Sequence, residues 1–372
     1  MIIREYERIF ADDCPHFDEL SKFTEAGEFL SFGWQRGRGA YVQAKNYVGV
    51  IRLPNGFQIE ILPKLNAPPE NLRGLVVDML RTLEEFSCKK FVDADLDTAR
   101  LDLYEIFIRV YLGMVTDLVK RGLKASYVVR EDNLTVFKGK LLVKENLRRN
   151  VAHRERFFVT FDEYSIDRPE HRLIKAALCK LRYVKSARRL LGAFDTVTTS
   201  TNYAKDFAAV SIDRTNHNYK AVMNWTRKIL AGKSFTPFAG KTEATALLFD
   251  MNRLFEAYVA AHARKVFADR FTVKIQAREQ FLFDEPRRFG LKPDIILDGY
   301  ERIILDTKWE LKPTPADMYQ MFAYAKRCGA REIYLLLPAT ENASYRTEGL
   351  TIQVCRVNPF DVSASLKTLL NL

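Results

Sequence analysis

Two aliphatic segments near the end of the chain, Pro293-Asp294-Ile295-Ile296-Leu297 and Ile303-Ile304-Leu305-Asp306-Thr307-Lys308, each carry a carboxylate beside a run of branched apolar residues. An Asp-Gly-Tyr sequence separates them, so the two segments are predicted to pair as a β-hairpin. Side chains two positions apart on a strand point to the same face, which places Asp306 and Lys308 together. The hairpin therefore predicts that Asp294, Asp306 and Lys308 meet at one sheet edge.

These side-chain types fit one kind of chemistry. Carboxylate oxygens are the ligands that Mg²⁺ prefers, and they suit Mn²⁺ as well. A metal ion on Asp294 and Asp306 would supply charge neutralisation and an activated water, and Lys308 would position or deprotonate that water. The pattern indicates a metal-dependent phosphodiesterase. An Asp-x-Lys pair on a strand is also compatible with a solvated ion pair, which contributes only about 0.2–1 kcal/mol.

One helix is predicted on each side of this hairpin. The downstream helix begins near Ala316-Asp317 and carries Gln320 and Tyr324, which lie on one helical face because they are four residues apart. The upstream helix is predicted over about residues 245–267 and carries Glu256, a candidate for a further carboxylate at the metal. Glu256 is also compatible with a solvated helix face, and Tyr324 with a packed aromatic residue.

The order of these elements resembles the PD-(D/E)xK nuclease superfamily, with Pro293-Asp294 first, Asp306-Thr307-Lys308 next and a Gln-x-x-x-Tyr helix last. The resemblance implies an α/β endonuclease-like domain in which Asp294 and Asp306 bind the metal and Lys308 orients or activates water. It also implies that Glu256 adds a metal contact or orients a ligand. Gln320 and Tyr324 would steady the substrate or the active-site strand.

The composition argues against several classes of protein. No apolar run in the 372 residues reaches membrane-spanning length, and residues 1–8 lack the order of a signal peptide, so a cytoplasmic protein without a membrane partner is expected. The five cysteines form no C-x-x-C pair and the five histidines show no H-E-x-x-H spacing. A zinc site and a disulfide framework are therefore not expected.

The positive charge is concentrated in the middle of the chain. Residues 121–234 hold 24 Lys and Arg against 11 Asp and Glu, an excess of 13, whereas the whole chain has a net charge of +11. Clusters such as Arg148-Arg149 and Arg188-Arg189 are candidates for contacts with the DNA backbone. A solvated helix face, or a surface that meets an acidic protein subunit, is the alternative.

The apolar patterns predict three regions. Residues 1–120 are expected to form an α+β domain, a candidate contact with a motor partner, with a hairpin that turns at Asn55-Gly56 and later helices. Residues 121–234 are expected to form a basic α+β region that docks DNA or a partner, including one long helix over about 169–191. Residues 235–372 are predicted as helix, three strands, helix, strand and strand, which is an α/β order.

Collinear segments along nearly the whole chain resemble the McrC family. They are Val48-Gly49-Val50-Ile51 through Glu60-Ile61-Leu62-Pro63-Lys64, Asn133-Leu134 with Lys138-Gly139-Lys140, and Phe161-Asp162-Glu163-Tyr164-Ser165 with Asp167 before His171-Arg172-Leu173-Ile174-Lys175. Members of this family are the nuclease subunits of McrBC 5-methylcytosine restriction systems.

The resemblance to the McrC family implies a division of labour. The chain would cleave DNA and leave recognition and GTP hydrolysis to an AAA+ GTPase motor of the McrB type, whose GTPase it stimulates. The Gly-Lys-Ser and Gly-Lys-Thr sequences at Gly232 and Gly240 lack the earlier glycine of a P-loop, which fits that division.

The resemblance also implies an N-terminal segment that enters the pore of the motor. The sequence Gln35-Arg36-Gly37-Arg38-Gly39 is a candidate for its tip, because arginines on a glycine-containing loop can reach a pore or a nucleotide site. A basic surface turn is the alternative. Two further functions stay open: a stand-alone PD-(D/E)xK nuclease of repair or recombination, and a non-catalytic adaptor that stimulates a motor.

Overall fold

The computed structural model describes residues 1–24, 29–53, 55–83, 101–230, 245–277, 280–339, 341–347 and 349–370. The chain forms two compact units, Met1–Phe107 with Lys233–Leu372, and Ile108–Gly232, and both mix helices with small sheets. The division into three regions at residues 120 and 234 stays a prediction. The Gly-Lys-Ser and Gly-Lys-Thr sequences lie outside the described residues. No helix within the described ranges is both long and apolar enough to cross a membrane.

Two small sheets form the N-terminal part of the first unit. One has the order β1-β6-β5-β10 and the other β2-β4-β3. The predicted hairpin at Asn55-Gly56 is confirmed, because β5 and β6 pair antiparallel and Gly56 takes a φ of 91° in the turn. The elements of this part are β1 (Ile2–Arg4), β2 (Arg8–Phe10), α1 (Phe17–Ser21), β3 (Leu30–Gln35), β4 (Gly39–Ala44), β5 (Tyr47–Arg52), β6 (Gln58–Leu62) and α2 (Pro69–Thr82).

The strand β10 (Thr245–Asp250) corrects a sequence prediction. The single helix expected over residues 245–267 is wrong for these six residues, and only Met251–Val266 form the helix α10. β10 pairs antiparallel with β5, with Leu248 opposite Gly49. A Cβ on Gly49 would lie 2.0 Å from the carbonyl oxygen of Leu247, so glycine permits the close approach. Tertiary pairing therefore decides the conformation of this segment.

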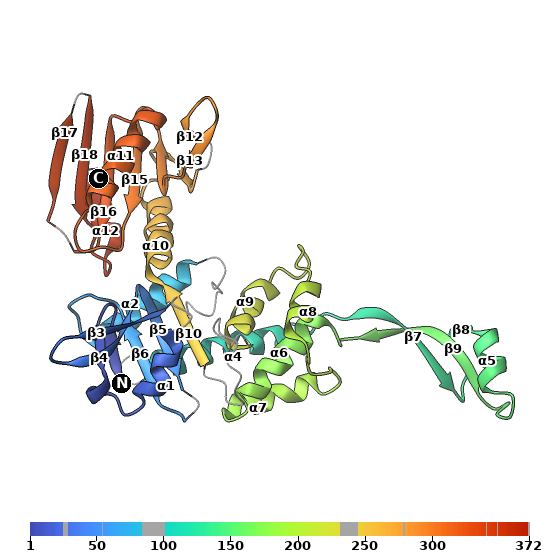
Figure 1. Ribbon diagram of the computed structural model, residues 1–372. Coiled ribbons are helices and arrows are strands. Elements are labelled where there is room, and N and C mark those ends of the chain that lie inside the picture. The colour runs from blue at the N-terminus through green and yellow to red at the C-terminus, as the bar shows by residue number, and fades with distance from the viewer. Residues whose placement is uncertain are drawn as a thin grey trace. The chain divides into compact units, whose positions relative to one another are not determined.

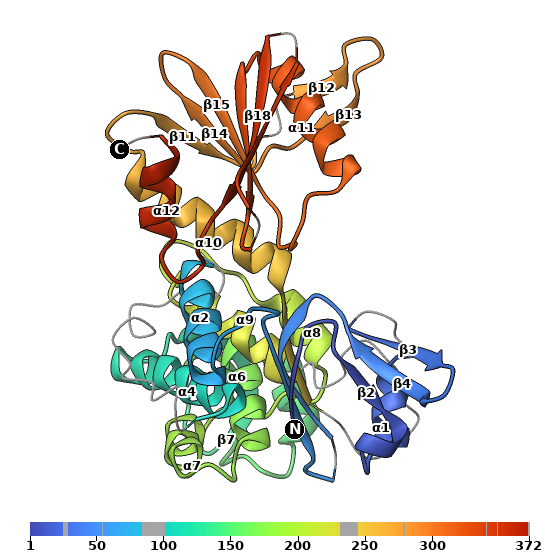
Figure 2. The ribbon, with the colours of Figure 1, turned by 90° about the vertical axis from the view of Figure 1, so that its left-hand side faces the viewer.

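A six-stranded sheet forms the C-terminal part of the first unit, in the order β11-β14-β15-β16-β18-β17. The predicted hairpin is confirmed, because β14 and β15 pair antiparallel. In Figure 2, α11 lies on one side of this sheet and α10 on the other. The elements are β11 (Thr272–Ile275), β12 (Gln280–Phe283), β13 (Arg288–Leu291), β14 (Ile295–Asp298), β15 (Arg302–Thr307), α11 (Pro315–Cys328), β16 (Glu332–Leu337), β17 (Ala343–Thr347), β18 (Leu350–Arg356) and α12 (Val362–Leu369).

This part contains more strands than the sequence pattern predicts. Five strands rather than three lie between α10 and α11, and β17 is an additional edge strand. Two of the unexpected strands, β12 and β13, form a hairpin of their own outside the six-stranded sheet. Their residues are exposed or only partly buried, so apolar periodicity gives little signal there.

The second unit combines helices with a long arm, whose sheet has the strand order β7-β9-β8. We call residues 126–165 the arm; its strands β7 (Ser126–Leu134) and β9 (Phe157–Ser165) pair along their whole length. Figure 1 shows them extending from the helices, with β8 and α5 at the far end. The other elements are α4 (Leu103–Lys120), which begins in the first unit, β8 (Lys140–Leu141), α5 (Val143–Arg149), α6 (Pro169–Lys180), α7 (Lys185–Leu191), α8 (Tyr203–Ala209) and α9 (Tyr219–Leu230).

The long helix expected over residues 169–191 is also wrong. It is two helices, α6 and α7, with a break in which Val184 has extended backbone angles. Leu181 and Ala187 are both buried. In one continuous helix these two residues would point about 120° apart, because each residue turns the helix by about 100°. The break lets both side chains reach the core.

Candidate active site

Asp294 and Asp306 lie opposite one another at one end of the β14–β15 hairpin. Ile295 pairs with Leu305 in the antiparallel register, and Asp294 and Asp306 occupy the next position outward. The Asp294 Oδ2 atom accepts hydrogen bonds from the backbone N–H and the hydroxyl of Thr307, at 2.8 and 2.7 Å. The hairpin thus brings the two predicted metal ligands to the same end of the sheet.

Lys308 pairs with Asp306. Its Nζ atom lies 3.0 Å from Asp306 Oδ2, and the Asp306 residue is only 1% exposed. The Lys308 ammonium is thus the charged partner of this buried oxygen. Burial lowers the pKa of Lys308, but the charges of Asp306 and Asp294 outweigh that effect and leave the pKa raised. Lys308 is therefore a cation at neutral pH.

Burial makes the two aspartates resist ionisation. It raises the pKa of Asp294 to about 7, and the charges of Asp306 and Glu256 add to this rise. Burial also raises the pKa of Asp306, against the opposing charge of Lys308. Buried carboxylates that repel one another fit a site for a divalent cation.

Glu256 lies close enough to influence both aspartates but does not complete a three-carboxylate cluster. Its Oε1 atom accepts a 2.6 Å hydrogen bond from the side chain of Gln276, whose backbone N–H donates to the Asp294 carbonyl oxygen at 2.8 Å. Within the described ranges, no three His, Cys, Asp or Glu side chains are grouped closely enough to hold a metal ion. Glu256 is thus connected to Asp294 through Gln276.

The predicted pair on helix α11 is brought together. The Gln320 side chain donates a 2.8 Å hydrogen bond to the Tyr324 hydroxyl, which donates to the Lys292 carbonyl oxygen at 3.1 Å. Tyr324 is also a buried residue that packs with Ile304 in the core under α11. These contacts hold the segment that leads into Asp294.

Trp309, beside Lys308, is a residue that the sequence analysis missed. It is 1% exposed, its indole ring lies 5.1 Å from the Phe255 ring, and its N–H donates to Glu5 Oε2 at 2.9 Å. The Lys64 ammonium donates to the Trp309 carbonyl oxygen at 2.6 Å. Burial raises the pKa of Glu5 to about 7. Trp309 and Glu5 are 304 residues apart, and no local pattern signals such a contact.

The candidate pore loop Gln35–Gly39 forms the turn between β3 and β4. The Arg38 guanidinium lies 3.9 Å from the centre of the Phe10 ring and 3.5 Å from Asp13 Oδ2. Trp34, at the end of β3, is 73% exposed. The loop has the form of a basic surface turn, and its contact with a motor stays a prediction.

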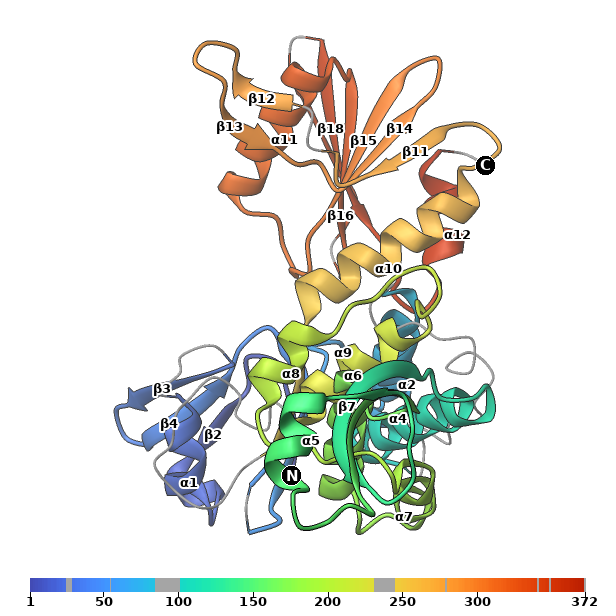
Figure 3. The ribbon, with the colours of Figure 1, turned by 90° about the vertical axis from the view of Figure 1, so that its right-hand side faces the viewer.

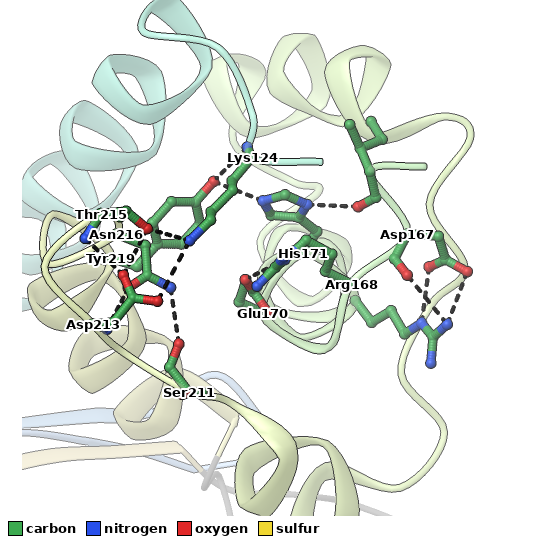
Figure 4. Close-up of polar contacts among 12 residues, drawn as sticks. Lys124, Asp167, Arg168, Glu170, His171, Ser211, Asp213, Thr215, Asn216 and Tyr219 are labelled. Carbon is green, nitrogen blue, oxygen red and sulfur yellow. Dashed lines mark hydrogen bonds and ion pairs between the residues drawn. The ribbon is translucent and has the colours of Figure 1, made fainter. Parts of the chain in front are cut away.

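A second buried polar cluster lies at the base of the arm (Figure 4). His171 is fully buried, and its Nδ1–H donates to the Ile166 carbonyl oxygen at 2.6 Å. Its Nε2 atom then accepts from the Tyr219 hydroxyl at 2.7 Å, and the same hydroxyl accepts from the Lys124 backbone N–H at 3.1 Å. Burial lowers the pKa of His171, so the ring is neutral. Every polar atom in this chain of contacts has a partner.

Charged pairs flank this cluster at both strand ends of the arm. Asp167, just after β9, accepts from the Arg172 guanidinium at 2.8 Å and from the Thr198 hydroxyl at 3.0 Å. Lys124, just before β7, donates to the Thr215 hydroxyl and lies 3.7 Å from Asp213. Asp167, His171 and Arg172 belong to the segments that resemble the McrC family, and in this structure they attach the arm to the helices.

The comparisons with known proteins give one family. The model of the family "McrBC 5-methylcytosine restriction system component" matches residues 42–338. No curated protein matches the chain.

The fold is similar to chains in two solved structures. One is a refined half-complex from a tetradecameric assembly of Thermococcus gammatolerans McrB AAA+ hexamers with bound McrC. It gives a TM-score of 0.72 and 19% identity, and the match covers 100% of this chain and 99% of that chain. The other is a cryo-EM structure of the Thermococcus gammatolerans McrBC complex, with a TM-score of 0.52 and 21% identity over 70% of this chain and 85% of that chain.

Proposed function

The chain belongs to the McrBC 5-methylcytosine restriction system component family, and on that basis we propose that it is the DNA endonuclease subunit of a modification-dependent restriction complex. It would cleave DNA when assembled with an AAA+ GTPase motor of the McrB type, whose GTPase it would stimulate. The similar structure with McrB AAA+ hexamers and bound McrC supports this partnership.

One observation carries the proposal of a nuclease: Asp294 lies opposite Asp306, and Lys308 lies 3.0 Å from the buried Asp306 oxygen. Asp294 and Asp306 would hold Mg²⁺, or Mn²⁺, in a PD-(D/E)xK-type site, with water and phosphate oxygens completing the coordination. Glu256 would act indirectly, through its hydrogen bond with the side chain of Gln276. The bound metal would supply charge neutralisation and an activated water.

The other residues of the site act by position and charge. Lys308 has a raised pKa and is therefore a cation that orients water and balances the charge of the phosphate, rather than a base. Tyr324, with Gln320, keeps the segment that leads into Asp294 in place through the Lys292 carbonyl. Trp309 fixes the backbone that follows Lys308 through its contacts with Glu5 and Lys64.

The arm is the proposed docking element for the motor. A two-stranded ribbon cannot bury its own apolar residues, and Tyr127, Val129 and Tyr164 are between 66% and 73% exposed. Exposed apolar side chains of this size indicate a surface that a partner covers. The basic residues of the second unit, among them Arg148 and Arg149 at the far end of the arm, would contact the partner or the DNA backbone.

The test uses the purified chain with Mg²⁺ and methylated plasmid, with and without a McrB-type motor and GTP. Asp306→Ala is compared with Asp298→Ala, which changes an aspartate at the turn end of the same hairpin. Cleavage that requires the motor and GTP, that is lost in Asp306→Ala and that is kept in Asp298→Ala is the expected result. Unchanged GTPase stimulation by Asp306→Ala shows that the variant is folded.

Two outcomes would replace the proposal. Cleavage by the chain alone, unaffected by the motor, would identify a stand-alone nuclease. GTPase stimulation without cleavage would identify an adaptor.

A further inference from the structure

The small hairpin of β12 and β13 is not part of the six-stranded sheet. It makes its own two-stranded sheet, and its second strand ends three residues before Asp294. Figure 3 shows it beside α11, away from the β11 edge of the six-stranded sheet. An isolated two-stranded hairpin adds little stability of its own, so this one is a candidate for a functional role.

Helix α11 holds both strands of the hairpin. The Arg327 guanidinium donates to the Phe281 carbonyl oxygen at 2.7 Å and to Asp284 Oδ2 at 3.1 Å. The end of β13 is held by the hydrogen bond from Tyr324 to the Lys292 carbonyl oxygen. The helix that positions Asp294 therefore also fixes the direction of the hairpin.

Two large aromatic side chains are displayed on this hairpin. Phe283 is 53% exposed and Phe289 is 68% exposed, and their ring centres are 5.9 Å apart at 69°. Phe289 has a φ of 59°, a left-handed conformation that is uncommon for a bulky residue and that tends to occur at functional positions. The two rings form an exposed aromatic pair.

The charge of the hairpin is positive around this pair. Arg287 and Arg288 are exposed in the turn and β13, and Lys292 follows the strand. Asp284 is engaged by Arg327, which leaves Glu285 as the one acid opposing them between residues 280 and 292. Exposed aromatic rings among arginines form a surface that suits DNA, with cations on phosphates and rings against bases or sugars.

The hairpin can reach several base pairs from the cleavage site. Phe289 lies five positions before Asp294, and an extended chain covers about 3.4 Å per residue, so the two are at most about 17 Å apart. Base pairs are stacked about 3.4 Å apart, so this reach corresponds to about five base pairs.

We propose that the β12–β13 hairpin binds double-stranded DNA in the minor groove beside the cleaved phosphate. Phe283 and Phe289 press against the base steps, and Arg287 and Arg288 contact the flanking phosphates. This inference rests on the proposed function, since it takes DNA as the substrate of the neighbouring site. The occupant is DNA rather than a protein because the rings lie among exposed arginines, on a hairpin that leads directly into Asp294.

The test measures DNA binding by the chain assembled with its motor. Ca²⁺ is used as the divalent ion so that binding is measured independently of cleavage. Duplexes carry 2-aminopurine at positions across the expected contact. Phe283→Ala with Phe289→Ala is expected to weaken binding about tenfold and to remove the fluorescence change of 2-aminopurine. Arg287→Ala with Arg288→Ala is expected to reduce the slope of log affinity against log salt by about 2.

Tyr300→Ala is the matched control. Tyr300 is a fully exposed aromatic residue in the turn between β14 and β15, at the end of that hairpin away from Asp294 and Asp306. It is expected to bind DNA like the wild type. The inference is overturned if both hairpin variants bind DNA with wild-type affinity and give the wild-type change in 2-aminopurine fluorescence. It is also overturned if the variants fail to assemble with the motor while their DNA binding is unchanged, because the hairpin would then be a protein contact. If Asp306→Ala still cleaves while the hairpin variants lose binding, the proposed function fails and the hairpin contact stands.

Discussion

The two buried polar clusters of this protein differ in how well their members are paired. At the base of the arm, both ring nitrogens of His171 and the hydroxyl of Tyr219 have partners of matching type. At the candidate active site, the buried carboxylates of Asp294 and Asp306 repel one another, and the Lys308 ammonium lies beside Asp306. A paired cluster stabilises a fold, whereas an incompletely paired one costs stability and is kept for chemistry.

The titration of the two clusters follows from this difference. Burial raises the pKa of Asp294 to about 7 and lowers the pKa of His171. Both groups are therefore driven toward their neutral forms. Because one is an acid and the other a base, their effects on stability run in opposite directions with pH.

The largest expected effect is that of Asp294→Asn. An amide oxygen can still accept the Thr307 hydrogen bonds, but the charge needed at the metal is removed, so cleavage by the complex should fall by about 10²–10³-fold. The same change relieves repulsion between buried carboxylates, so the unfolding free energy of the chain without metal should rise above pH 7. Cleavage assays and denaturant unfolding measure the two effects. Loss of both activity and stability would mean that this cluster is structural.

The opposite pattern is expected for His171→Ala. The substitution removes one hydrogen-bond donor from the Ile166 carbonyl and the acceptor of the Tyr219 hydroxyl, and it opens a cavity, so the second unit should lose about 2–4 kcal/mol. Native-state hydrogen exchange of α6 and of the arm measures this loss. His217→Ala changes an exposed histidine of the same unit and serves as the control. Equal exchange in the two variants would contradict a role of His171 in holding the arm.

The pH dependence of the wild type separates the two clusters without mutation. The folded state of Asp294 binds its proton more tightly than the unfolded state, so its contribution to stability is lost as the pH rises from about 4 to about 7. The unfolded state of His171 binds its proton more tightly than the folded state, so its contribution is lost as the pH falls below about 6.5. Hydrogen exchange at several pH values without divalent metal should show opposite slopes in the two units. Slopes of the same sign would contradict the comparison.

The smallest expected effect is that of Tyr324→Phe, which removes the hydrogen bond to the Lys292 carbonyl while keeping the packed ring. Stability should fall by about 1 kcal/mol and cleavage by about tenfold, because the segment that leads into Asp294 is less firmly held. Tyr319→Phe, on the exposed face of the same helix, should change neither. Full activity in Tyr324→Phe would limit this tyrosine to packing.

Local sequence patterns are sufficient for the central hairpin. The period of two along a strand and the Asp-Gly turn set the register that brings Asp294 and Asp306 to one end, and they set the side shared by Asp306 and Lys308. The spacing of four on α11 likewise predicts the contact between Gln320 and Tyr324. These relations involve neighbours in sequence or in one hairpin.

Long-range contacts escape such patterns. Leu247 and Phe249 are compatible with a helix or a strand, and pairing with β5 decides in favour of the strand. The partners of His171 and Trp309 lie far along the chain at Tyr219 and Glu5, so neither cluster leaves a local signal. The connection of Glu256 to Asp294 likewise escapes local patterns, because it runs through Gln276, whose position in the sequence shows no spacing that links it to either residue.

The pairing of β10 with β5 also imposes an order on biosynthesis. Val48 finds its partner Phe249 only after the whole unit Ile108–Gly232 has left the ribosome, because that unit lies between them in sequence. Until then β5 is an edge strand with apolar side chains and unpaired backbone groups, the type of edge that recruits other chains. A nascent chain that stalls within the second unit therefore carries an open, aggregation-prone sheet, and completing translation is what closes it.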